Sequence, residues 1–209
     1  MTSPGRRWVW YGGRPSLDFV NTGRNREAGR RDAAAEYLRE PADFAAWLHE
    51  AGLVPAGSGG GRSPVLEEAV DEETFAGALA LREAIDAAVA ATVAARSVPV
   101  KAVRCVNEWI AAEPERPALR IEAGVPELRA PRAGRTPRGA LALIAADAAE
   151  LLGTGLRERL RICPGPGCRG RFLDDSPAGR RRWCSMAVCG NRSKAAAHRQ
   201  AVQAAAGRP

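Results

Sequence analysis

The amino-acid sequence predicts an α+β protein in two parts. The first is a mostly helical domain with a few short antiparallel strands, and the second is a small module that ends in a helix. Stretches rich in alanine, with apolar residues at helical spacing, dominate residues 1–156. Four of the five cysteines are gathered between Cys163 and Cys189. We therefore expect a first domain over residues 1–156 and a second over residues 157–209.

The first segments of the chain suggest short elements. Residues 8–11 (Trp-Val-Trp-Tyr) have strand composition and are followed by two glycines, so a short strand is expected there. Residues 15–22 predict a short helix, with Ser16 as its N-cap and its apolar side chains facing inward. Residues 24–36 are charged and contain glycine, which predicts a loop.

Apolar periodicity predicts four longer helices in the rest of the first domain. They are expected over residues 41–52, about 72–96, 100–112 and 136–152. Gly52 and Gly153 stand where the first and last of these should end, and Thr136-Pro137 is typical of a helix start. Residues 55–64 predict a flexible linker. The segments 119–121 and 127–129, joined through Gly124, predict a β-hairpin.

The cysteines form two short pairs. Four residues separate Cys163 from Cys168 and Cys184 from Cys189, and fifteen residues lie between the pairs. Two such pairs are typical of one tetrahedral Zn²⁺ site, in which four thiolates leave no open position for catalysis. We therefore expect one structural zinc ion. The fifth cysteine, Cys105, has no partner at this spacing and is expected to be a small core residue.

Disulfides and ordinary buried thiols are the alternatives to a metal site. No signal peptide opens the chain, which favours a reducing cytoplasm over an oxidising compartment. Unrelated buried thiols would not explain the paired spacing. Zinc is the interpretation that accounts for all four cysteines.

Two segments resemble known families. Cys189-Gly190-Asn191-Arg192, with its upstream cysteines, resembles the CGNR zinc finger over about residues 159–200. This resemblance implies a zinc-ribbon or treble-clef-like module that binds DNA in bacterial proteins. Residues 17–22 (Leu-Asp-Phe-Val-Asn-Thr) resemble the signature of the ABATE domain, which commonly precedes that finger. The second resemblance implies a stress-induced transcription regulator.

Charge is distributed unevenly between the two parts. Residues 157–209 carry twelve Arg or Lys and three acidic residues, a formal charge of +9, although the whole chain has only +7. This asymmetry favours a polyanionic partner for the second part, and DNA is the leading expectation. Part of the positive charge is expected to offset a zinc–thiolate centre, which carries −2 of its own.

A helix that begins near Asn191 would display the residues best suited to nucleic acid. Its N-terminal amides should point toward the Cys189 sulfur and favour the thiolate charge. Arg180, Arg181 and Arg182, next to Trp183, form a second basic segment. The candidate DNA-contacting residues are therefore Arg180, Arg181, Arg182, Arg192, Lys194 and Arg199.

Four polar residues near the N-terminus have two interpretations. Asp18, Asn21, Thr22 and Arg24 could line a pocket for a small effector. Alternatively, Asp, Asn and Thr side chains at such positions bond neighbouring backbone groups, and this is the commoner outcome. Local bonding is favoured, and a small-molecule effector remains the alternative.

The sequence argues against catalysis and against a membrane location. It contains two histidines and no recognised nucleophile or zinc-protease motif, so we expect no enzyme. No apolar run has the length of a membrane span, and a cytoplasmic, nucleoid-associated protein is expected. The alternatives to a DNA-binding regulator are an RNA-binding protein, a protein-interaction adaptor with the finger as scaffold, and a metalloenzyme. A homodimer is compatible with the first domain.

Overall fold

The computed structural model describes residues 8–24, 35–54, 69–112, 118–122, 124–129 and 136–206. The predicted linker over residues 55–64 lies outside them. Within the described residues, no helix combines the length and the apolar character needed to cross a membrane.

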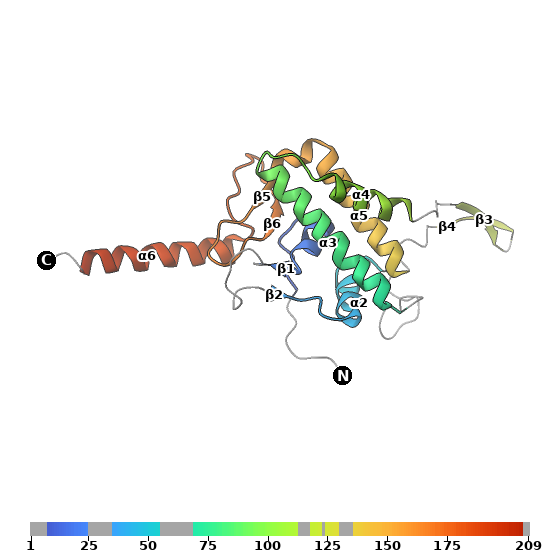
Figure 1. The fold of residues 1–209 in the computed structure, drawn as a ribbon, viewed down its shortest axis with the longest axis horizontal. Coiled ribbons are helices and arrows are strands. Elements are labelled where there is room, and N and C mark those ends of the chain that lie inside the picture. The colour runs from blue at the N-terminus through green and yellow to red at the C-terminus, as the bar shows by residue number, and fades with distance from the viewer. Residues whose placement is uncertain are drawn as a thin grey trace.

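Helices form the body of the first domain, as the sequence predicts. Three of them, α3 (Glu72–Val93), α4 (Val100–Ala111) and α5 (Pro137–Gly153), lie side by side (Figure 1). Two shorter helices, α1 (Pro15–Val20) and α2 (Pro41–Glu50), pack against α3 and α5. These five helices confirm the helical expectations for residues 15–152, with boundaries that differ by a few residues.

Small residues let the long helices approach one another closely. Ala140, Ala145 and Ala148 of α5 are completely buried. Gly77 of α3 lies against Trp109 of α4, and a Cβ atom at Gly77 would come within 2.6 Å of the Trp109 ring. Alanine and glycine therefore set the spacing, and the larger aliphatic and aromatic side chains fill the core between the helices.

The described residues contain three two-stranded antiparallel sheets. They are β1 (Gly23–Arg24) with β2 (Ala35–Glu36), β3 (Ala118–Glu122) with β4 (Val125–Arg129), and β5 (Leu160–Ile162) with β6 (Arg171–Leu173). The β3–β4 pair confirms the predicted hairpin, and Gly124 takes φ +83° in its turn. The prediction of a loop over residues 24–36 is wrong at both ends of that segment, where Arg24 pairs with Ala35 and Glu36 pairs with Gly23.

Two other local predictions are wrong. Residues 8–11 form no regular strand; instead Trp8 packs against Tyr37 and Trp10 stacks on Trp47, with ring centroids 6.3 Å and 5.8 Å apart. Aromatic contacts, rather than a strand partner, fix this segment. Ser16 is not an N-cap, because α1 begins one residue earlier with Pro15, and the Ser16 backbone amide donates to Asp147 Oδ2 over 2.9 Å.

The second part is not separated from the first. Leu160 of β5 and Leu173 of β6 belong to the same apolar core as α1, α3 and α5. Strand β6 packs against α1, and β5 packs against α3. The domain boundary after residue 156 remains a prediction, but the hairpin that follows it is part of the main core.

The chain ends in a long projecting helix. A π-helical turn, Met186–Gly190, leads into α6 (Asn191–Ala206), which confirms the predicted start at Asn191. Figure 1 shows α6 extending away from the body of the protein. Residues 191–203 are exposed, apart from the half-buried Ser193 and Ala196.

Candidate metal centre and nucleic-acid interface

Four cysteine side chains converge at the base of α6. Cys163, Cys168, Cys184 and Cys189 are all buried, and their sulfur atoms lie within 4.8 Å of one another. The Sγ atom of Cys184 is 3.5 Å from that of Cys168 and 3.6 Å from that of Cys189. Zinc–sulfur bonds of about 2.3 Å at tetrahedral angles place the sulfurs about 3.8 Å apart. The cluster therefore fits one structural Zn²⁺ ion, as the spacing of the cysteines predicts.

Tight turns bring the first pair into place. The Cys168 amide donates to the Gly165 carbonyl over 2.9 Å, and the Cys163 amide donates to the Gly170 carbonyl over 2.8 Å. A Cβ atom at Gly165 would lie 3.1 Å from the Cys189 Cβ and 3.3 Å from its sulfur. Glycine is needed there because the chain passes directly beside the sulfurs.

The π-helical turn places the second pair. Ser185 caps this turn, with its side chain accepting from the Val188 amide, and the Cys189 amide donates to the Ser185 carbonyl over 2.9 Å. The turn carries Cys189 back toward Cys184. The expectation that the amides of α6 face the Cys189 sulfur is wrong for the first of them, because the Asn191 amide donates to the Met186 and Val188 carbonyls of the π-helical turn.

The electrostatics of the cluster favour a cation. Hydrogen bonds with Cys163 and Cys184 lower the pKa of the Cys168 thiol, whereas burial and a hydrogen bond with Cys168 raise the pKa of Cys189. Hydrogen bonds with Cys163 and Cys168 also raise the pKa of Cys184. Four adjacent sulfurs cannot all ionise without a compensating charge. A divalent metal ion supplies that charge and accepts all four thiolates.

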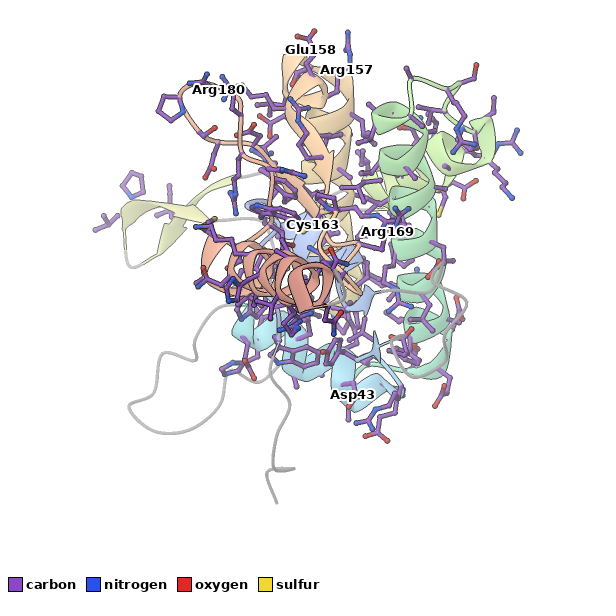
Figure 2. The ribbon with its side chains drawn as sticks, turned by 90° about the vertical axis from the view of Figure 1, so that its left-hand side faces the viewer. Asp43, Arg157, Glu158, Cys163, Arg169 and Arg180 are labelled. Atoms are coloured by element: carbon purple, nitrogen blue, oxygen red, sulfur yellow. The ribbon has the colours of Figure 1, made fainter. Side chains whose placement is uncertain are left out.

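Five of the six predicted nucleic-acid residues are exposed: Arg180, Arg182, Arg192, Lys194 and Arg199. Arg182 lies over the Trp183 ring, 4.9 Å from its centroid. The Arg192 guanidinium lies 3.4 Å from the Pro166 carbonyl, which links the first turn of α6 to the first cysteine pair. Figure 2 shows the face from which α6 projects; Arg157, Arg169 and Arg180 are labelled on this side of the molecule, with the acidic Glu158 next to Arg157.

Arg181 is oriented differently from its neighbours. Its guanidinium donates to the Trp183 carbonyl over 3.1 Å and to Asp175 over 2.9 Å, and it also bonds the Cys184 carbonyl. The same group lies 5.1 Å from the centroid of the Phe172 ring. These contacts direct Arg181 toward the metal centre. Its contact with DNA remains a prediction.

The four predicted effector residues lie close together in the chain, but their described contacts are internal. Asp18 Oδ1 accepts from the Gly12 amide over 2.7 Å, and Thr22 Oγ1 donates to the Phe19 carbonyl over 2.7 Å. Asn21 bonds the backbone of Arg171 in β6. Arg24 lies in β1, and its side chain is outside the described part of the chain. Effector binding by these residues remains a prediction.

Sequence reasoning missed two residues of this site. Arg169, next to the ligand Cys168, is exposed with φ +51°, and its place directly after a metal ligand was an available signal. Asp174 is completely buried. It accepts from the Ser176 hydroxyl over 2.6 Å and from the Arg181 amide over 2.9 Å. Burial raises the pKa of Asp174, but these hydrogen bonds outweigh it and leave the pKa below its ordinary value. Nothing in the sequence near Asp174 indicates that its carboxylate is buried and bonds Ser176 and Arg181.

The fold and the site together define a class of protein in which a helical domain is followed by a four-cysteine zinc finger. Comparison with family models gives two matches. Residues 13–155 match the ABATE family, described as "Putative stress-induced transcription regulator", and residues 159–201 match the CGNR zinc finger. The chain therefore belongs to the ABATE family and carries a CGNR zinc finger. A search of curated proteins finds no match.

Proposed function

We propose that this protein is a DNA-binding transcription regulator in which α6 and the arginines around its base contact DNA. The observation that carries the proposal is the exposure of α6 together with its charge. Residues 191–206 include two arginines and one lysine but no acidic residue. A protruding helix with this composition is suited to a groove lined by phosphates.

The exposed surface of the finger around α6 is also positively charged. Between residues 157 and 203, seven Arg or Lys side chains are exposed, against two exposed acidic side chains, Glu158 and Asp175. The zinc centre fixes this surface by joining the turn after Cys163 to the start of α6. The zinc has a structural role in this proposal, and the protein is not an enzyme.

Salt dependence tests the proposal most simply. Fluorescence anisotropy would measure binding to a labelled random-sequence duplex over a range of salt concentrations. The variant combines Arg192→Ala, Lys194→Ala and Arg199→Ala. We expect it to reduce the slope of log K against log salt by about 2 to 3, because each lost phosphate contact removes about 0.9.

A control with the same change in charge is available on the other part of the protein. Arg96, between α3 and α4, and Lys101 and Arg104 of α4 are exposed. Replacing all three with Ala should leave the slope nearly unchanged. An equal loss in the control would show that net charge, not the finger, causes binding. Tighter binding to a structured RNA of similar length would instead favour an RNA-binding protein.

For the first domain we propose effector sensing or assembly into a homodimer. Val100, Val103 and Ile110 of α4 are 74%, 46% and 37% exposed, which supports assembly. Sedimentation analysis of the intact protein and of a Val103→Asp variant would test it. A concentration-dependent dimer that the substitution dissociates is the expected result, and a monomer at all concentrations would leave effector sensing as the proposed role.

A further inference from the structure

Asn21 joins the finger to the first domain through a pair of hydrogen bonds. Its Nδ2 donates to the Arg171 carbonyl over 2.9 Å, and its Oδ1 accepts from the Arg171 amide over 2.8 Å. Asn21 is only 3% exposed. The side-chain amide thus takes the place of a neighbouring strand along the outer edge of β6.

The backbone geometry of β6 explains why this edge is available. Strand β6 pairs with β5 along its inner edge. Arg171 and Leu173 are two residues apart, so their backbone groups face the same edge in an antiparallel strand. The Leu173 amide donates to the Gly12 carbonyl over 2.8 Å. The first domain therefore completes the finger's hairpin on the side that β5 leaves open.

A salt bridge reinforces this junction, by which we mean the contacts of Asn21 and Gly12 with β6. The Arg171 side chain reaches Asp86 of α3, with 2.7 Å between Arg171 Nε and Asp86 Oδ1. A hydrogen bond of 3.1 Å also joins Arg171 Nη2 to Asp86 Oδ2. The two side chains are 7% and 22% exposed, so solvent screens this pair only in part.

The junction lies directly beside the metal centre. Gly170 precedes Arg171, and a Cβ atom at Gly170 would lie 3.4 Å from the Cys168 sulfur and 3.5 Å from Asn21 Oδ1. The Gly170 carbonyl accepts from the Cys163 amide. The hairpin that Asn21 binds is therefore the hairpin that holds two of the four metal ligands.

From these contacts we infer that zinc binding and the folding of the first domain are thermodynamically coupled, with Asn21 as the positioning residue. Zinc fixes the β5–β6 hairpin, and the fixed hairpin supplies Leu160 and Leu173 to the main core. Coupling of this kind is reciprocal, so a stronger junction must also strengthen zinc binding. This coupling does not depend on whether the protein binds DNA.

Zinc affinity of the full-length protein provides the first test. Competition with a chromogenic zinc chelator would compare the wild type with Asn21→Ala, which removes both hydrogen bonds to Arg171. We expect affinity to fall by about tenfold or more. The reason is that the junction forms fully only when zinc holds the hairpin.

A matched control separates coupling from general destabilisation. Val106→Ala removes a buried side chain of α4, which packs against α3 and α5. This change should lower the melting temperature but leave zinc affinity within about twofold, because the domain remains folded at the assay temperature. If Asn21→Ala also lowers only the melting temperature, Asn21 has a merely structural role and the inference is overturned.

Hydrogen exchange provides the second test, which uses the wild type and does not require Asn21→Ala to fold. Removing zinc from the wild type should accelerate amide exchange in α1 and α3, which touch the hairpin. Asp86→Asn, which keeps the size of the side chain but removes the salt bridge, should weaken zinc binding by at least about threefold. Unchanged exchange in α1 and α3 after zinc removal would overturn the inference.

Discussion

At the scale of single residues, Asp18 has an environment that disfavours its charge. Burial raises the pKa of Asp18 from 3.8 to about 6, although the Gly12 and Tyr11 amides oppose this shift; the nearby Asp147 adds to it. The folded state therefore binds a proton more tightly than the unfolded state does. The resulting stabilisation is complete below about pH 4 and is lost as the pH rises from about 4 to about 6.

Asp18→Asn should remove this pH dependence. Asparagine keeps an oxygen that can accept from the Gly12 amide but carries no charge to bury. We expect the variant to be more stable than the wild type above pH 6, by about 1 to 3 kcal/mol, and equal to it near pH 4. Denaturant unfolding of both proteins at several pH values would measure the difference. A less stable variant at pH 7 would show that the charge of Asp18 is needed.

Arg181 and Arg180 are adjacent in sequence but differ in their contacts. Arg181→Ala should lower the free energy of unfolding of the zinc-loaded protein by about 1 to 3 kcal/mol, because it leaves backbone carbonyls near the metal centre without their donor. Arg180→Ala, at an exposed position, should change it by less than about 0.5 kcal/mol. Thermal unfolding would compare them, and equal effects would contradict the structural role of Arg181.

The difference between these two arginines marks the limit of prediction at this scale. The four metal ligands could be predicted because their spacing in the sequence is itself the signal. The side-chain roles of Arg181 and Asp174 could not, since their partners are backbone groups that the fold brings together. Asn21 was predicted to bond locally, but its partner lies 150 residues away.

At the scale of elements, α6 differs from every other long helix in the described residues. Its main packing partner is the π-helical turn that precedes it, and its side chains are almost all exposed. Isolated helices of this length are marginally stable in water even when rich in alanine. We therefore expect α6 to fray in the free protein and to become fully helical when bound.

Ala197→Pro tests the role of α6. Proline in the interior of a helix costs about 3 kcal/mol, which an unsupported helix cannot offset. The expected results are a loss of helical circular dichroism, a melting temperature within about 2 °C of the wild type, and DNA affinity lower by about tenfold. Ala197→Gln, which tolerates the helix, serves as the control.

Two outcomes would contradict this account of α6. A large drop in the melting temperature of Ala197→Pro would show that α6 supports the core. Unchanged affinity for DNA in a variant that has lost the helix would show that the contact surface lies elsewhere on the finger.

Periodicity explains why some elements could be predicted and others could not. The longer helices bury one face, so their apolar residues recur at helical spacing. Strands β1, β2, β5 and β6 are two or three residues long, which is too short for an alternating apolar pattern to be recognised. Residues 8–11 have strand composition, but no strand in the described part of the chain pairs with them. Amino-acid composition alone could not distinguish the short strands, which form, from residues 8–11, which do not form a strand.

At the scale of the whole molecule, the finger is an extension of the first domain rather than an independent unit. The cysteine cluster has its own small core with Phe172, and β5 and β6 join this core to the main one. The family matches at residues 13–155 and 159–201 meet at this junction. The orientation of α6 relative to the helical body is consequently set by the hairpin that carries the first pair of cysteines.

One zinc ion, held by Cys163, Cys168, Cys184 and Cys189, organises this arrangement. X-ray absorption at the zinc edge of the purified, full-length protein tests it directly. We expect one zinc ion per chain with four sulfur neighbours at about 2.3 Å. A spectrum with nitrogen or oxygen neighbours in place of any of these sulfurs, or protein purified without zinc, would contradict it.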